Sequence, residues 1–426
     1  MSIKTPSNQR GARQSSFVAL RHRDFRLLWF GQLVSQAGTQ MTIVAISWQL
    51  YKLTNNPLSL GLIGLFRIIP LLTFSLGSGV LADAFDRRKL MLFSQTTAML
   101  LAAMLAVTTY LGMATTALIY ATILLSSTAN TFDLPARQAL IPSLVPREHL
   151  TNALSLNIIA WQIATIVGPT IAGLLLAWRK DADVVYAIDA LSFGAVIVSL
   201  LLMRTRHVIT EKRNVSLGAA LEGLRFVRGT PILFWTMGLD FIATFFAGAM
   251  TLLPVFARDI LLVDERGLGL LYAAPSAGAV VTGLLMARIG NVRRQGPVIL
   301  WSVAIYGICT AIFGISTSFV LSCLMLAGIG ASDTVSMVIR NTLRQNLTPD
   351  ELRGRMVSVN QIFFAGGPQL GEIEAGVVAR LLGASVSVWT GGVACVLAVL
   401  IVALHVPQLR NYQDTPVELE AGGVPS

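Results

Sequence analysis

The chain consists of long runs of apolar residues separated by short polar or charged breaks. Each run holds about twenty residues, which is enough for an α-helix rising 1.5 Å per residue to cross a hydrocarbon core of about 30 Å. The apolar residues do not alternate with polar ones, as the strands of a membrane barrel require. The pattern therefore predicts an all-α integral membrane protein.

Twelve transmembrane helices are predicted, six in each half of the chain. The first six span residues 27–50, 58–82, 90–111, 115–134, 152–178 and 184–203, and the second six span residues 231–256, 267–288, 296–315, 318–340, 356–379 and 384–406.

The helices group into two predicted bundles with three polar segments around them. The bundles comprise residues 27–203 and 231–406, and the polar segments are a cytoplasmic N-terminal segment (1–26), a linker (204–230) and a cytoplasmic tail (407–426). The linker places apolar residues at helical spacing among basic ones, which indicates a helix lying along the membrane surface, a plain tether, or both.

Charge supports this organisation. Apolar residues make up 54% of the chain and charged residues only 13%, against roughly 25% charged in soluble domains. If both termini face one side, 25 of the 32 Lys and Arg residues lie on that side, six lie opposite, and Arg67 falls within a helix. Because positive loops stay in the cytoplasm, we expect cytoplasmic termini in the inner or plasma membrane. This topology explains the net charge of +10, so nucleic acid is not an expected partner.

The two halves resemble each other in sequence. Residues 137–176 and 340–379 align without a gap at an offset of 203, and eleven of the forty positions are identical, among them Arg137/Arg340 and Gly173/Gly376. The offset spans six helices, an even number, so both halves enter the membrane in the same direction. A parallel repeat is therefore predicted, which argues against inverted-repeat transporter folds.

A loop motif follows the second predicted helix. The segment GVLADAFDRRK, residues 79–89, combines a glycine, acidic residues and paired arginines. A glycine allows close helix approach, and an aspartate at a membrane edge needs basic partners. We predict a gating latch whose candidate residues are Gly79, Asp83, Asp86, Arg87 and Arg88. The same arginines would also serve as a topology anchor alone.

This loop resembles the signature of the major facilitator superfamily, although Asp86 stands where the general pattern has Gly. The segments FDLPARQALIPSLVP from Phe132, RNTLRQNLTPDELRGRMVSVNQ from Arg340 and QLGEIEAG from Gln369 are similar to the branch that contains enterobactin exporters and other efflux proteins. The resemblance runs over residues 17–406. It implies two pseudo-symmetric six-helix bundles that rock about a central cavity, commonly driven by proton antiport.

A second motif, GPTIAG at residues 168–173, resembles the Gly/Pro signature of antiporters. Its residues Gly168, Pro169 and Gly173 would form a pivot or a seal between helices, and ordinary small-residue packing is the alternative. The arginine that drug/proton antiporters carry in their fourth helix is missing from residues 115–130.

Six acidic residues fall within the membrane region: Asp133, Asp189, Asp240, Asp333, Glu372 and Glu374. A charge at the bilayer centre costs about 3 kcal/mol on insertion scales, so such residues usually face a cavity or a partner. Asp133 lies four residues from Arg137 and Asp333 seven from Arg340, so each pair can share a helical face.

A carboxylate paired in this way stays ionised, whereas an unpaired one in a dry cavity exchanges protons near neutral pH. Asp240 and Glu372 have no basic neighbour in sequence. We predict Asp240, Glu372 and Asp133, in that order, as proton-coupling residues, with Asp333 as a further candidate. For Asp189 and Glu374 we expect helix-end solvation or structural hydrogen bonds.

Polar stripes predict the lining of a central cavity and substrate site. Its candidates are Gln32, Gln36, Gln40, Arg67, Trp161, Asp240 and Thr244. Arg67 could balance a carboxylate, attract an anionic substrate, or hold the second helix through a buried pair. Trp161 could offer aromatic surface to an amphiphile or act in packing.

Enzyme motifs are missing. The sequence contains no GxxxxGK[ST] segment, no nucleophile elbow and no His/Cys cluster. We therefore expect no catalytic residues, no cofactor and no metal, and we expect a monomer that binds a small-molecule substrate and protons in a lipid bilayer. The predicted function is export of small organic molecules by proton antiport with alternating access. An uptake symporter or facilitator on the same fold, or a non-transporting receptor or scaffold, is the alternative.

Overall fold

The structure is a computed structural model, and it describes residues 17–84, 86–204, 224–246, 248–290, 292–349 and 352–413. Within these ranges the side chains of residues 75–84 and of several positions between 353 and 365 are not described. Every regular element in the described ranges is helical. The interfacial helix predicted in the linker falls largely on residues 205–223, which lie outside them.

The first bundle contains six long helices. They are α1 (Arg23–Thr54), α2 (Pro57–Ala84), α3 (Arg87–Tyr110), α4 (Thr116–Leu140), α5 (Leu150–Arg179) and α6 (Asp183–Leu202). Short 3-10 turns precede α1 and join α4 to α5: η1 (Val18–Arg21), η2 (Ile141–Ser143) and η3 (Arg147–His149).

The second bundle begins with an interrupted helix. The interrupted helix consists of α8 (Pro231–Phe246), the 3-10 segment η4 (Gly248–Leu252), α9 (Leu253–Val255) and the π-helical turn η5 (Phe256–Ile260). The remaining elements are α10 (Glu265–Ile289), α11 (Gln295–Ile315), α12 (Phe319–Leu347), α13 (Arg353–Leu382), α14 (Ala384–His405) and α15 (Pro407–Arg410).

Nine of the described helical segments are long and apolar enough to cross a membrane. The helices α1, α4 and α13 are just as long, at 32, 25 and 30 residues, but they are more polar. They carry Gln32, Asp133 and Glu372, which were predicted for the cavity or for proton coupling. Six segments before the linker and six after it agree with the predicted fold.

Local sequence sets several helix starts. A side-chain oxygen at the residue before the helix accepts a bond from a backbone N–H of the first turn in four helices, α3, α4, α10 and α12. The capping residues are Asp86, Thr115, Asp264 and Ser318. Such caps satisfy donors that have no partner within the helix, so they fix where each span leaves the membrane edge.

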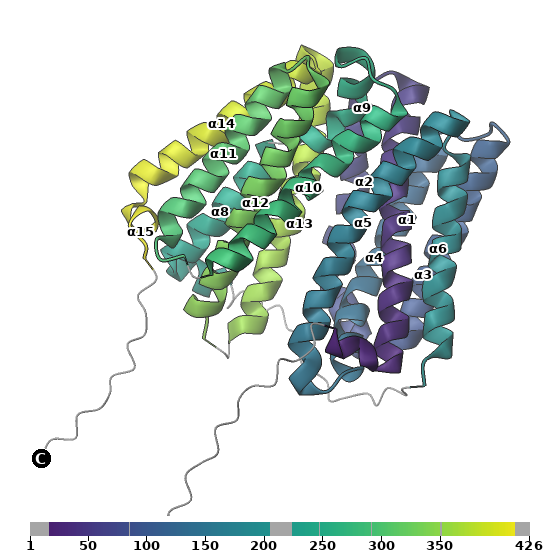
Figure 1. The fold of residues 1–426 in the computed structure, drawn as a ribbon, viewed down its shortest axis with the longest axis horizontal. Helices are drawn as coiled ribbons and strands as arrows, with labels where there is room; N and C mark the ends of the chain where they lie inside the picture. Colours follow the sequence, from purple (N-terminus) through teal and green to yellow (C-terminus); the bar gives the residue numbers. More distant parts are fainter. Residues whose placement is uncertain are drawn as a thin grey trace, which may run out of the picture.

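The two bundles stand side by side (Figure 1), and their buried residues form a shared core at one end. We call the end where α1 begins and where α6 and α14 end the terminus face, and the end where α1 ends and where α6 and α14 begin the far face. One cluster of buried apolar residues, running from Met41 to Val388, unites both bundles in the far half. In the terminus half, the described buried residues form separate clusters in the first and second bundles. The two bundles therefore meet through their far halves.

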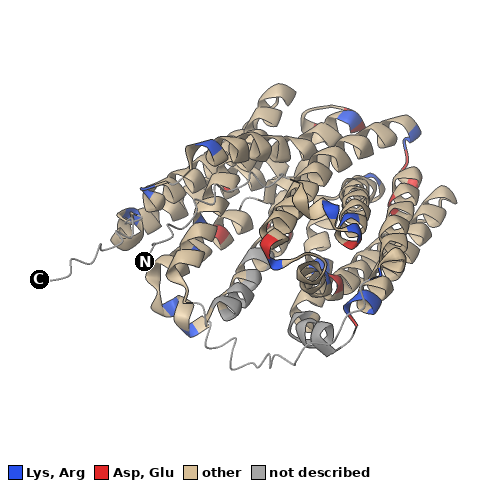
Figure 2. Cartoon of the chain, turned by 60° about the horizontal axis from the view of Figure 1, so that its bottom comes forward, with Lys and Arg blue, Asp and Glu red and all other residues tan. Residues whose placement is uncertain are grey.

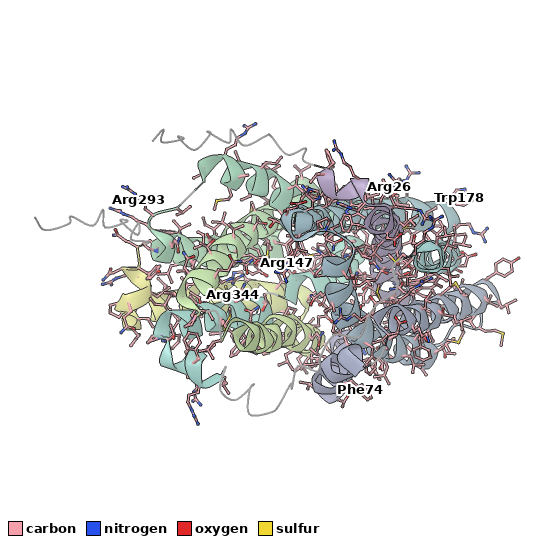
Figure 3. All side chains as sticks on the ribbon, turned by 90° about the horizontal axis from the view of Figure 1, so that it is seen from below. Arg26, Phe74, Arg147, Trp178, Arg293 and Arg344 are labelled. Carbon is pink, nitrogen blue, oxygen red and sulfur yellow. The ribbon has the colours of Figure 1, made fainter. Side chains whose placement is uncertain are left out.

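Figure 2 shows that Lys and Arg gather at the ends of helices, with few along the spans. Figure 3 views the terminus face, where Arg147 of the first bundle and Arg344 of the second lie near the centre. This distribution is the one expected when the helix interiors lie in lipid and the ends in water.

Candidate functional site

Glycines bring the bundles into backbone contact in the far half. On one side α2 packs on α13, where a Cβ added to Gly376 would lie 2.6 Å from the Gly61 Cα. On the other side α5 packs on α10, where a Cβ on Gly173 would lie 2.8 Å from the Gly269 Cα. Real Cβ atoms do not approach so closely, so only glycine permits either contact.

These two contacts are equivalents within the internal repeat. Gly173 and Gly376 are aligned positions at the offset of 203 residues, and each packs on a glycine of the other bundle. The repeat detected in the sequence therefore appears in the structure as a pair of matching helix–helix seals.

Polar side chains join the bundles at the far face itself. The Tyr51 hydroxyl at the end of α1 donates a hydrogen bond to Asp259 in the π-helical turn. In the same turn, Arg258 Nη1 donates to Asn55 Oδ1 at 2.7 Å. Lys180 Nζ lies 2.8 Å from Glu265 Oε2. Together with the glycine contacts, these bonds close the far face.

A cavity of about 180 Å³ lies between the bundles on the inner side of this closure. Polar groups from both bundles line it: Gln40, Ser47, Arg67, Thr165, Thr251, Tyr272, Ser276 and Glu372. Its apolar walls come from Ile43, Val44, Leu60, Ile63, Pro169 and Met250. Trp161 lies two turns before Pro169 on α5 and is 51% exposed. A mostly apolar space with a few convergent polar groups is typical of a small-molecule site.

An ion pair crosses this cavity from one bundle to the other. Arg67 Nη1 of α2 lies 3.2 Å from Glu372 Oε1 of α13, and 27% and 20% of the two side chains are exposed. The second carboxylate oxygen, Oε2, is buried with no hydrogen-bond partner in the described structure. Glu372, which has no basic neighbour in sequence, thus obtains one from the other half of the chain.

A second cluster lies within the second bundle, where α8, α11 and α12 meet. Arg340 Nη1 is 2.5 Å from Asp240 Oδ1, and Arg340 Nη2 is 3.6 Å from Asp333 Oδ1. Arg340 and Asp240 are largely buried, whereas 48% of the Asp333 side chain is exposed. Arg344, one turn further, also interacts electrostatically with Arg340 and Asp240. One arginine therefore connects a buried carboxylate with an accessible one.

The first bundle holds a corresponding cluster around Arg137, the repeat partner of Arg340. Arg137 Nε lies 3.7 Å from Asp133 Oδ2, and Arg137 Nη1 donates to Gln32 Oε1 at 2.7 Å. Gln95 of α3 donates to Asp133 at 3.0 Å. Here a neutral glutamine of α1 occupies the role that Asp240 of α8 has in the second bundle.

Asp189 and Glu374 are the remaining two acids predicted within the membrane region. The carboxylate of Asp189 accepts bonds from Thr42 at 2.7 Å and Ser192 at 3.3 Å, which is the structural hydrogen bonding expected of it. Glu374 is half-buried on α13.

The predicted gating latch is only partly described. The surroundings of Gly79 and Asp83 lie outside the described side chains. Asp86 caps α3, Arg87 donates to the Ala139 carbonyl of α4, and Arg88 donates to the Met203 and Leu201 carbonyls at the end of α6. The arginines thus tie the ends of three helices of the first bundle together, and the latch remains a prediction.

The GPTIAG motif contacts both bundles. Gly168 packs on α1, where an added Cβ would lie 2.7 Å from the Ala37 carbonyl oxygen, and Pro169 lines the cavity. Gly173 packs on α10 of the other bundle. The motif therefore lies beside the cavity at a contact between the bundles, and its role as a pivot or a seal stays a prediction.

The predicted cavity residues separate into three groups. Gln40 and Arg67 line the central cavity, and Gln32 belongs to the Arg137 cluster, with Gln36 donating to it. Asp240 and Thr244 line a smaller pocket inside the second bundle. Prediction missed Tyr51, Asp259 and Tyr272, because their partners lie on helices far away in sequence.

Comparison with known proteins places this geometry in a family. A model of the family described as transmembrane secretion effector matches residues 14–420. The chain belongs to this family. Enterobactin exporter EntS of Escherichia coli strain 536 is 24% identical over 402 residues, which cover 94% of this chain and 96% of that protein. EntS of Salmonella typhi is 25% identical over 410 residues with the same coverage.

Solved structures share the fold. Nucleoside transporter NupG matches with a TM-score of 0.70 at 14% identity over 92% of this chain and 100% of its own. A peptide transporter POT matches with a TM-score of 0.73 at 9% identity, covering 92% and 95%. A bacterial homologue of ferroportin in an inward-facing state matches with a TM-score of 0.65 at 17% identity, covering 92% and 99%. The chain is a multi-pass membrane transporter of the major facilitator type and not an enzyme.

Proposed function

We propose that this transporter exports small organic molecules across the inner membrane by proton antiport with alternating access. The terminus face is cytoplasmic, as the distribution of Lys and Arg in the sequence supports. Enterobactin or a similar siderophore is the first substrate to test, because the curated relatives are named as enterobactin exporters.

Alternating access is supported by the way the bundles meet. Their contacts in the described residues lie in the far half, and they consist of glycine seals and a small number of polar bonds. Breaking these contacts while forming new ones in the terminus half would expose the cavity to the other side. A second state of this kind requires only a rigid-body movement of one bundle against the other.

Proton coupling is carried by the Asp240–Arg340–Asp333 cluster, and the position of Asp333 is the observation on which this proposal depends most. Asp333 is half-exposed, while Asp240 lies closer to the arginine they share. Arg340 binds the ionised form of Asp333 once the proton has left, so release does not strand a charge in a medium of low polarity. When Asp333 is protonated, its carboxyl group is neutral. The transporter then passes more readily through the intermediate in which the cavity is closed on both sides.

Asp133 and Glu372 rank below Asp333 in this proposal because each has an arginine that it shares with no other carboxylate in the described structure. Asp133 is buried, and Gln95 and Arg137 hold its charge. Glu372 pairs with Arg67. A carboxylate held in this way stabilises the structure in its ionised form and exchanges protons less readily.

Inside-out membrane vesicles test the proposal, because their outer surface presents the cytoplasmic face. With an acidified lumen, we expect labelled enterobactin to accumulate, and we expect no accumulation without the pH gradient. Asp333→Asn should abolish gradient-driven accumulation and retain exchange of labelled for unlabelled enterobactin. Asn keeps the shape of the side chain and cannot carry the proton.

The matched control is Asp133→Asn, which removes the carboxylate that pairs with Arg137 in the first bundle. We expect it to retain accumulation driven by the gradient. Full accumulation by Asp333→Asn would contradict the assignment of the proton site. If enterobactin does not move at all, comparing the metabolites secreted by cells with and without the gene selects the next substrate.

A further inference from the structure

In the part of the chain that the structure describes, one cationic side chain lines the central cavity. Of its lining residues as the structure describes them, only Arg67 is a Lys or Arg, and Glu372 is the one acid. The other polar groups are neutral amides and hydroxyls, such as Gln40 and Tyr272. The charge preference of the cavity therefore depends on which member of the Arg67–Glu372 pair a ligand can reach.

The two members of the pair differ in accessibility. A guanidinium has five N–H donors, and the structure gives Arg67 one hydrogen bond, from Nη1 to Glu372 Oε1. More of the Arg67 side chain is exposed than of Glu372, at 27% against 20%. The unpaired oxygen of Glu372, Oε2, is buried. The cavity thus offers unused donors to a ligand and hides the free acceptor.

We propose that the transported molecule carries an anionic oxygen group, such as a carboxylate, phenolate or phosphate, and that this group docks on Arg67. Such groups match the guanidinium fork, and charge-assisted bonds of this kind are about twice as strong as neutral ones. The apolar wall of Ile43, Leu60 and Met250 takes the remainder of the molecule. The substrate class is therefore an amphiphilic organic anion.

Docking at Arg67 also links binding to the closure between the bundles. Arg67 belongs to α2 and Glu372 to α13, and the pair lies beside the glycine contact of these two helices. An anion on the guanidinium competes with Glu372 for the same donors. Ligand binding therefore weakens a contact that holds the far half closed. The ligand binds the far-open state more tightly than the far-closed state, and this difference in affinity shifts the equilibrium toward the far-open state.

The test compares three probes that share one ring system and differ in charge. The probes are 1-naphthoate, 1-naphthalenemethanol and 1-naphthylmethylammonium, titrated calorimetrically into the full chain in lipid nanodiscs. We expect naphthoate to bind about tenfold more tightly than either other probe. This factor corresponds to the low end of the strength of one hydrogen bond to a charged group. Arg67→Gln should remove this preference, and Arg67→Lys should restore part of it.

Two variants separate docking from a merely structural effect. Glu372→Gln keeps the side-chain shape and releases the guanidinium. Naphthoate should then bind about tenfold more tightly, which corresponds to gaining one hydrogen bond to a charged group at the low end of its range. Arg380→Gln removes one positive charge from the exposed far end of α13 and should leave the affinity unchanged. Unchanged naphthoate affinity in Arg67→Gln, preference for the ammonium probe, or no binding of any probe by the folded wild type would overturn the proposal.

The inference rests on the proposed export function, and binding is therefore measured apart from transport. If naphthoate binds through Arg67 and no solute accumulates in acid-filled vesicles, the anion site stands and the export proposal fails. If solute accumulates and the charge preference is missing, export stands and the anion site fails.

Discussion

Gly376 of α13 lies against Gly61 of α2 so closely that a Cβ on Gly376 would be 2.6 Å from the Gly61 Cα. The contact joins the two bundles, and it has a repeat-related equivalent at Gly173 and Gly269. The closed far face thus depends on four positions without side chains. In lipid, where helices gain little from apolar burial, such close backbone packing is a main source of association.

Gly376→Val should therefore hold the far face open. The added methyl groups meet backbone atoms, which cannot move aside as a flexible side chain would. A cysteine at Thr251, which lines the cavity, should then react faster with a charged thiol reagent added from the far side. The matched control is Gly194→Val on α6, where an added Cβ meets nothing within 4 Å. Equal reaction rates in the two variants would contradict this role of the contact.

The Tyr51–Asp259 bond should act as a gate at the far face. Tyr51→Phe and Asp259→Asn each weaken one hydrogen bond to a charged group, worth about 1.5–3 kcal/mol, so each should raise the far-open population by about tenfold or more. Spin-label distances across the far face measure the populations. Because both changes remove the same contact, the double variant should do little more than either single one.

The Lys180–Glu265 ion pair at the same face should matter less. Its nitrogen and oxygen are 2.8 Å apart, and 64% of the Lys180 side chain is exposed. Exposed pairs contribute about 0–1 kcal/mol. Lys180→Met should change the spin-label distances by much less than Tyr51→Phe, and an equal change would show that exposed charge dominates the gate.

Arg137 should hold the first bundle together more than Asp133 does. Arg137→Met leaves the buried Asp133 carboxylate without its cation, and breaking a buried pair in this way costs about 3–5 kcal/mol. Asp133→Asn leaves Arg137 bonded to Gln32, so the melting temperature in detergent should fall less. Adding Asp133→Asn to Arg137→Met should restore part of the loss. If the double variant melts no higher than Arg137→Met, the unpaired Asp133 carboxylate is not the cause of the lower melting temperature.

The fold was largely predictable because lipid imposes a simple rule on sequence. Long apolar runs marked the helices, and most of their ends agree with the structure to within a few residues. The two largest differences occur where α4 continues to Leu140 and α12 to Leu347. Each of these helices continues past an arginine at or before which, because of its charge, the sequence predicts the end of the helix. Arg137 and Arg340 remain within the helices because each has at least one carboxylate partner inside its bundle.

The site was less predictable because its pairs form between distant helices. Asp240 has no basic neighbour in sequence, yet Arg340 lies 2.5 Å away, one hundred residues further along the chain. Glu372 and Arg67 come from opposite bundles. Hydropathy identified which residues were unusual in a membrane, and only the packing of the helices shows which of them meet.

Proton counting during substrate movement tests the central claim most directly. Liposomes containing the purified protein with its terminus face outward, an acidic lumen and a pH-sensitive dye in the lumen would receive enterobactin from outside. Antiport predicts that the lumen becomes more alkaline as enterobactin enters, and that Asp333→Asn removes this change. A lumen that becomes more acidic as enterobactin enters, or whose pH does not respond to it, would contradict the account.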